Sequence, residues 1–139
     1  MTALADGRNT PYREGSRYSL PVAAAKTLYP GALAALDASG NVTPGATATG
    51  LKGIGRVEAL ADNGSGAAGD IRADIRPGIY RWENSTSTDE ITAAEVGDTC
   101  YMVDDQTVAK TDGGSTRSPA GTIIDVDDLG VWVASGLTI

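Results

Sequence analysis

Two stretches near the C-terminal end decide the fold: TCYMVDDQTVA at residues 99–109 and AGTIIDVDDLGVWV at residues 120–133. In each, a run of apolar, β-branched and aromatic residues stops at a short group rich in aspartate and resumes beyond it. Aspartate and glycine supply the backbone geometry of tight turns. Each stretch therefore predicts a β-hairpin, with its turn at 104–106 in the first and at 127–130 in the second.

The middle of the chain alternates in a way that also predicts β-structure. Ile71, Ala73 and Ile75 are separated by the charged residues Arg72 and Asp74. A period of two is typical of a half-buried strand. We expect the two isoleucines to point to one side of a sheet and the charged residues to the other.

An alanine-rich segment, residues 23–36, has a composition that would suit a helix. Pro30 interrupts it, because proline lacks a backbone N–H donor and disfavours helical geometry at the residue before it. We therefore expect two short strands joined at Pro30-Gly31. Residues 92–95, Thr-Ala-Ala-Glu, have the spacing of a capping box and predict one helical turn closed by Gly97.

Length and composition set the expected architecture. The chain has 139 residues, the size of one ordinary domain, and its 18 glycines and 6 prolines punctuate it too often for a helix bundle. We expect an all-β fold with a single core, built as a small barrel or sandwich of five to eight short antiparallel strands. At most one or two short helical turns and an extended N-terminal arm complete it. No internal repeat of fixed period is visible.

Residues 1–17 are predicted to form that arm, and residues 18–139 a single β-rich domain. The arm has only two large aliphatic side chains, Met1 and Leu4, and so cannot bury enough surface to fold alone. We expect it to be flexible until a partner orders it.

The charge of the chain argues against nucleic acid as the partner. It carries 11 basic and 18 acidic residues, a net charge of −7, whereas binding to phosphates depends on lysine and arginine. Residues 1–88 hold nine basic and eight acidic groups, while residues 89–139 hold two basic and ten acidic ones. Arg8, Arg13 and Arg17 of the arm are therefore expected to meet carboxylates of a protein partner.

A membrane is not expected as a partner either. No apolar run approaches the roughly 18 residues of a membrane span. The first residues contain no hydrophobic stretch that would serve as a signal peptide. The sequence predicts a soluble protein that stays where it is made.

The chain contains no familiar catalytic constellation. It has no histidine, the usual general base and metal ligand, and its single cysteine, Cys100, lies in an apolar run that predicts an inert buried thiol. Asp104, Asp105 and the aspartates of 125–128 could ligate calcium or magnesium, but both groups lie where a hairpin needs turn residues. We expect no enzyme, no cofactor and no metal site.

The two tryptophans are the most prominent aromatic residues. Trp82 and Trp132 each end or lie within a predicted strand. Packing in the core or against another subunit is therefore expected, in preference to a ligand-binding surface.

Three stretches of this sequence resemble a known family. They are PVAAAKTLYPGALAALDASGNVTPG at 21–45, GDTCYMVDDQTVA at 97–109 and AGTIIDVDDLGVWV at 120–133. They are similar to small structural proteins encoded beside the major capsid protein in Mu-like and related tailed phages. The chain is identified on these turn-and-strand phrases as a member of the head decoration, or capsid cement, proteins.

That resemblance implies a β-rich subunit, often a trimer, on the outer face of the mature capsid, where it clamps neighbouring capsid subunits. The implied partners are the major capsid protein and further copies of the chain. The implied location is the virion, after assembly in the cytoplasm of the bacterial host. Of the residues in this sequence, Arg8, Tyr12, Arg13 and Arg17 are expected to contact the capsid, and Trp82 and Trp132 another subunit.

Two other classes of function stay open at this point. One is a different phage structural role, in the tail or baseplate. The other is a small-ligand-binding β-barrel or an enzyme, although the abundance of alanine and the absence of phenylalanine favour an interior that closes on itself.

Overall fold

The protein is all-β, as the sequence predicted. A computed structural model describes residues 2–11 and 16–136. The described residues form twelve strands and two single-turn 3-10 helices: β1 (Tyr18–Pro21), β2 (Lys26–Leu28), β3 (Leu33–Leu36), β4 (Val42–Pro44), β5 (Lys52–Val57), β6 (Ala61–Asn63), β7 (Arg72–Arg76), β8 (Gly78–Trp82), η1 (Ser87–Asp89), η2 (Ala93–Glu95), β9 (Thr99–Met102), β10 (Val108–Ala109), β11 (Pro119–Asp127) and β12 (Gly130–Ser135). The expected five to eight strands are too few, because several strands span only two to four residues and show no period in the sequence.

The first half of the described domain is a small barrel. Its sheet has the order β1-β7-β5-β3-β4, with every neighbouring pair antiparallel. A parallel bridge between Val22 and Val42 joins the two edges of the sheet, and the Ala23 amide donates to the Val42 carbonyl at 2.9 Å. The two-stranded sheet of β2 and β6 adds Leu28 and Ala61 to the same core. We call residues 18–77 barrel 1.

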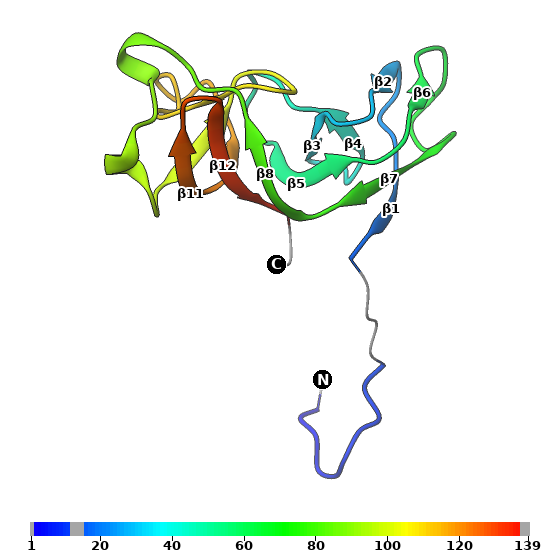
Figure 1. Ribbon diagram of the computed structural model, residues 1–139. Helices are drawn as coiled ribbons and strands as arrows, with labels where there is room; N and C mark the ends of the chain where they lie inside the picture. The colour runs from blue at the N-terminus through cyan, green and yellow to red at the C-terminus, as the bar shows by residue number, and fades with distance from the viewer. Residues whose placement is uncertain (1, 12–15, 137–139) are drawn as a thin grey trace.

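The second half closes in the same manner. Its sheet has the order β8-β12-β11-β9-β10, again antiparallel throughout. A parallel bridge between Glu83 and Thr107 closes it, and the Val108 amide donates to the Glu83 carbonyl at 2.9 Å. We call residues 78–136 barrel 2. Figure 1 shows the two barrels next to each other, with β11 and β12 toward the left, β1 and β7 toward the right, and β8 and β5 between them.

The two barrels repeat one topology. Strands β1, β3, β4, β5 and β7 of barrel 1 take the places that β8, β9, β10, β11 and β12 take in barrel 2. In the ladder of β3 with β5 the pairing registers repeat with a shift of 66 residues: Leu33↔Arg56, Ala34↔Gly55 and Ala35↔Gly53 in barrel 1 correspond to Thr99↔Thr122, Cys100↔Gly121 and Tyr101↔Pro119 in barrel 2. Both ladders are also irregular at the same place. The repeat is one of backbone geometry, which is why the sequence shows none.

The core is divided into two clusters, so the expectation of a single core is wrong. Strand β3 explains how the clusters connect, because alternate residues of a strand point to opposite faces. Ala34 belongs to the cluster inside barrel 1, whereas Leu33 and Ala35 belong to the cluster of barrel 2. All three are fully buried. The outer face of β3 is therefore apolar because barrel 2 covers it.

Glycine at position 53 lets the barrels approach closely. A Cβ atom at Gly53 would collide with the backbone carbonyl of Ala120 on β11. Beside this contact, the Leu33 amide donates to the Asp105 carbonyl at 2.8 Å. Backbone therefore lies directly against backbone where the barrels meet.

The local predictions for turns and hairpins are confirmed. Strands β9 and β10 form one predicted hairpin and β11 and β12 the other. Strands flank Pro30-Gly31, and no helix crosses it, although β2 and β3 belong to different sheets. The capping box is present at η2: Thr92 Oγ1 accepts from the Ala94 amide, and Glu95 Oε1 accepts from the Thr92 amide at 2.8 Å.

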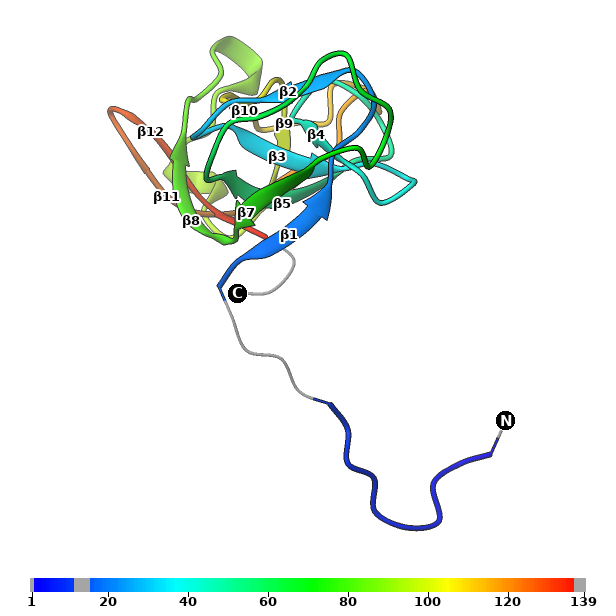
Figure 2. The same ribbon diagram turned by 90° about the vertical axis from the view of Figure 1, so that its right-hand side faces the viewer.

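The N-terminal residues lie apart from both barrels. Residues 2–11 are exposed throughout and run away from β1 in both views (Figures 1 and 2). Strand β1 begins at Tyr18, directly after the predicted arm. The flexibility of the arm stays a prediction.

Candidate interaction surfaces

The predicted arm residues have separate places in the structure. Arg17 is tied to barrel 1, since its guanidinium lies 3.0 Å from Asp74 on β7. Among the described residues, the Arg8 side chain bonds within its own segment, through a hydrogen bond of 2.8 Å to Thr10 Oγ1. Tyr12 and Arg13 lie outside the described residues. Capsid contact by the four residues stays a prediction.

Trp82 is a core residue of barrel 2. Its side chain is 5% exposed, and its indole Nε1 donates to Ser135 Oγ at 3.2 Å. The Tyr80 ring packs on it at a centroid distance of 5.9 Å. The structure thus supports the core alternative for Trp82, and the ring has almost no surface left for a second subunit.

Trp132 lies at the surface, where it contacts Arg81 and Asp127. No pattern in the sequence indicated these contacts. Strand pairing places it opposite Arg81, whose guanidinium carbon lies 5.4 Å from the centre of the Trp132 ring. The indole Nε1 donates to Asp127 Oδ2 at 2.8 Å. A half-buried tryptophan stacked with arginine is typical of protein interfaces. Subunit contact at Trp132 stays a prediction.

A shallow groove borders Trp132 where barrel 2 meets barrel 1. Its volume is about 440 Å³, and it is lined by Gly31, Arg56, Ile79, Tyr80, Arg81, Trp82 and Trp132. Arg56 of β5 lies over the Tyr80 ring at 4.6 Å. No sequence signal marks this groove, because it depends on the contact between barrels.

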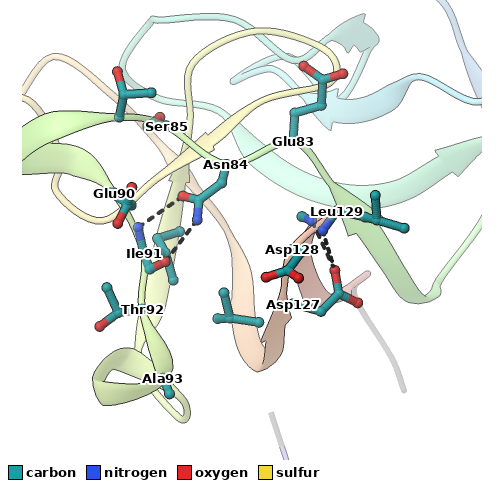
Figure 3. A pocket seen from close by; sticks show the side chains of 13 residues that line it. Glu83, Asn84, Ser85, Glu90, Ile91, Thr92, Ala93, Asp127, Asp128 and Leu129 are labelled. Atoms are coloured by element: carbon teal, nitrogen blue, oxygen red, sulfur yellow. Dashed lines mark hydrogen bonds between the residues drawn. The ribbon is translucent and has the colours of Figure 1, made fainter.

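A broad depression on barrel 2 is acidic (Figure 3). Its volume is about 610 Å³, and four carboxylates line it, those of Glu83, Glu90, Asp127 and Asp128. Asn84 spans one wall: its Oδ1 accepts from the Ile91 amide at 2.9 Å, and its Nδ2 donates to the Ile91 carbonyl at 2.8 Å. These hydrogen bonds hold the 84–91 loop.

Asp104 and Asp127, two of the aspartates considered as metal ligands, act as turn residues. Asp127 Oδ1 accepts from the Leu129 amide at 2.8 Å and the Gly130 amide at 3.0 Å. Asp104 Oδ1 likewise accepts from the Gln106 amide at 2.9 Å. In the part of the chain that the structure describes, no three His, Cys, Asp or Glu side chains gather as a metal site.

Because these carboxylates accept hydrogen bonds in the folded protein, the stability of the fold depends on pH in the acid range. Hydrogen bonds from Trp132 and Leu129 lower the pKa of Asp127, and those from Thr111 and Arg117 lower the pKa of Asp89. A lowered pKa in the folded state means that the stabilisation is complete above the unfolded pKa, near pH 4, and is lost as pH falls through the folded value.

We therefore expect the urea midpoint of unfolding to be level above about pH 5 and to fall below about pH 4. The variant Asp127→Asn, which has no carboxyl to titrate there, should show a smaller fall. Equal falls in the two proteins would contradict the role given to Asp127.

Cys100 is the inert buried thiol that the sequence predicted. It is fully buried in the core of barrel 2, and its Sγ contacts the Gly121 carbonyl at 3.6 Å. Burial raises the pKa of this thiol to about 12.

A thiolate is needed for nucleophilic attack. We therefore expect a chromogenic disulfide reagent to leave native protein unlabelled at about pH 8 and to titrate one thiol per chain after unfolding in urea. Rapid labelling of the native protein would show that this part of the core opens.

These features define an all-β protein of two like barrels with an exposed arm. Comparison with family models, curated proteins and solved structures finds no match for the chain. Among the described residues, no helix has the length and apolar character needed to cross a membrane.

Proposed function

We propose that this protein is a structural component of a tailed-phage virion. It binds the outer surface of the mature capsid as an oligomer, for which we propose a trimer, and stabilises the shell by clamping neighbouring major capsid subunits. The protein acts by binding, without catalysis or cofactor. The proposal rests on the family resemblance of residues 21–45, 97–109 and 120–133, and on the following structural observation.

The arm is the observation that carries this proposal. Residues 2–11 are exposed, and the hydrogen bonds that Gly7, Arg8 and Thr10 make within that described segment are to near neighbours. A segment with so few contacts of its own gains them when it orders on a partner. An oligomer whose arms engage several identical sites dissociates slowly even when each arm binds weakly. A capsid lattice offers such repeated sites.

The interior of the barrels favours this proposal over a ligand-binding barrel. Buried side chains occupy both cores, including Ile54 and Ile75 in barrel 1 and Met102 and Ile123 in barrel 2. The depressions described above are open surface features. A tail or baseplate role stays as the alternative, and capsid binding separates it from decoration.

The proposal is tested with the purified full-length protein and shells of its phage. Light scattering measures the oligomer, and sedimentation measures binding to expanded and unexpanded shells. We expect a stable trimer that pellets with expanded shells only. A protein that pellets with neither shell would contradict decoration and favour the tail alternative.

A further inference from the structure

The outer face of barrel 1 carries a cluster of arginines next to the origin of the arm. Arg72 and Arg76 alternate with buried residues along β7 and so point outward. Arg56 on β5 lies directly opposite Arg76 in the strand pairing, which puts two positive charges side by side. Arg17 reaches the same face through Asp74. We call Arg17, Arg56, Arg72 and Arg76 the arginine face.

The carboxylates around the arginine face only partly neutralise it. Asp74 pairs with Arg17 at 3.0 Å, and Glu58 pairs with Arg56 at 3.0 Å. Arg72 donates to Ser19, an uncharged residue. Within the described residues, the Arg76 side chain has no ion-pair or hydrogen-bond partner. Like charges opposite each other across strands destabilise a sheet, so the fold gives no reason for placing Arg76 opposite Arg56.

Barrel 2 shows that the topology forms without these arginines. The register repeat identifies an equivalent position for each one. The residues at the positions of Arg17, Arg56, Arg72 and Arg76 are Ile79, Thr122, Gly130 and Ala134, all uncharged. The same strands pair in the same registers in both barrels. The arginine face is thus a property of the surface of barrel 1 and not of the fold.

The two barrels also differ in net charge. Residues 18–77 carry five basic and five acidic groups, whereas residues 78–139 carry three basic and eleven acidic ones. All of the net negative charge therefore belongs to the second barrel. An acidic partner surface would repel barrel 2 and attract the arginine face, so it would orient the molecule with barrel 1 inward.

We propose that the arginine face is a docking surface for an acidic protein surface, and that barrel 2 points away from it into solvent. This inference rests on the proposed function, in which a capsid subunit supplies the acidic surface. Arginine suits the contact because its planar guanidinium pairs with carboxylates through two parallel hydrogen bonds. Arg17, the last residue of the arm, lies at this face through its pair with Asp74. The arm and the arginine face would therefore contact the same partner.

The test removes Arg72 and Arg76, the two arginines of this face that pair with no carboxylate among the described residues. Full-length Arg72→Ala/Arg76→Ala is compared with wild type for binding to expanded shells at about 0.05 M and about 0.3 M salt. We expect at least a tenfold loss of apparent affinity at the lower salt and a weaker dependence on salt. The matched control, Lys26→Ala/Lys110→Ala, removes two exposed positive charges outside the arginine face and should bind within about threefold of wild type.

Two further measurements separate docking from a structural role. The variant Arg72→Lys/Arg76→Lys keeps the charge but cannot form paired guanidinium hydrogen bonds, so it should recover part of the binding that the alanine variant loses. The melting temperature of the alanine variant should stay within about 3 °C of wild type, as for surface positions. A large fall in melting temperature would make the arginines structural and overturn the inference.

The outcomes also separate this inference from the proposed function. If wild type binds expanded shells and the alanine variant binds equally well, the docking face is wrong while decoration stands. If wild type itself does not bind shells, the proposed function fails. The capsid is then not the acidic partner of the arginine face.

Discussion

Removal of residues 2–16 is expected to leave a folded oligomer that no longer attaches to expanded shells. Residues 2–11 are exposed, so their loss takes nothing from either core. The truncated chain keeps Arg17 and its pair with Asp74. An oligomer binds through several arms at once, so removing all of them lowers the apparent affinity for shells by more than the loss of one arm would. We expect the apparent affinity to fall by about a hundredfold or more. Co-sedimentation over a concentration series measures it.

A matched control distinguishes the chemistry of the arm from its length. A protein in which a Gly-Ser sequence of equal length replaces residues 2–16 should fail to attach in the same way, because it lacks Arg8 and Arg13. The melting temperature of both proteins should equal that of wild type. Attachment of the truncated protein at wild-type affinity would contradict the arm as the principal contact.

The substitution Gly53→Ala is expected to have the largest effect on stability. Its Cβ would meet the Ala120 carbonyl, and Gly53 and Ala120 lie within the sheet strands β5 and β11. The strands cannot move apart without opening the contact of Leu33 and Ala35 with the second core. We expect a loss of about 3 kcal/mol in the free energy of unfolding, or roughly 10 °C in Tm, measured by urea and thermal unfolding.

Gly64→Ala serves as the control for the change of residue type. The nearest atom to a Cβ at Gly64 is Oδ1 of the exposed Asp62 side chain, at 3.1 Å, and the atoms near that Cβ belong to side chains, whereas those at Gly53 belong to backbone. We expect a change within about 0.5 kcal/mol. If Gly53→Ala were as stable as this control, the close packing of the barrels would be refuted.

Local β-structure could be predicted because its signals lie within short stretches. The two hairpins at 99–109 and 120–133 carry both strands and their turn in a few residues, and Pro30 excludes a helix by its own chemistry. Within β7 the alternation correctly predicted that Ala73 and Ile75 are buried and that Arg72 is exposed. Each of these inferences needed no knowledge of distant contacts.

The pairing of whole barrels could not be predicted in this way. Equivalent positions hold different residue types, such as Ala34 and Cys100 or Arg56 and Thr122, since the repeat lies in hydrogen-bond registers. Gly55 and Gly121 are identical at the shared irregularity, a signal too short to detect alone. The second core was missed for the same reason: β3 is buried on both faces only because barrel 2 covers one of them.

The candidate site was predicted only in part. The sequence identified Arg17 as a surface residue of interest, but the neighbouring arginines of β5 and β7 come together only through strand pairing. Trp82 and Trp132 have similar sequence surroundings, yet the first is a core residue and the second stacks on Arg81 at the surface. Tertiary contacts, which the local sequence does not show, decide which of the two tryptophans is buried.

The most direct test of the account is electron cryo-microscopy of expanded shells incubated with the full-length protein. Decoration predicts density on the outer surface, with barrel 1 against the shell, barrel 2 outward and residues 2–16 traceable between capsid subunits. Shells without added density, or density in which barrel 2 and its carboxylates meet the shell, would contradict it.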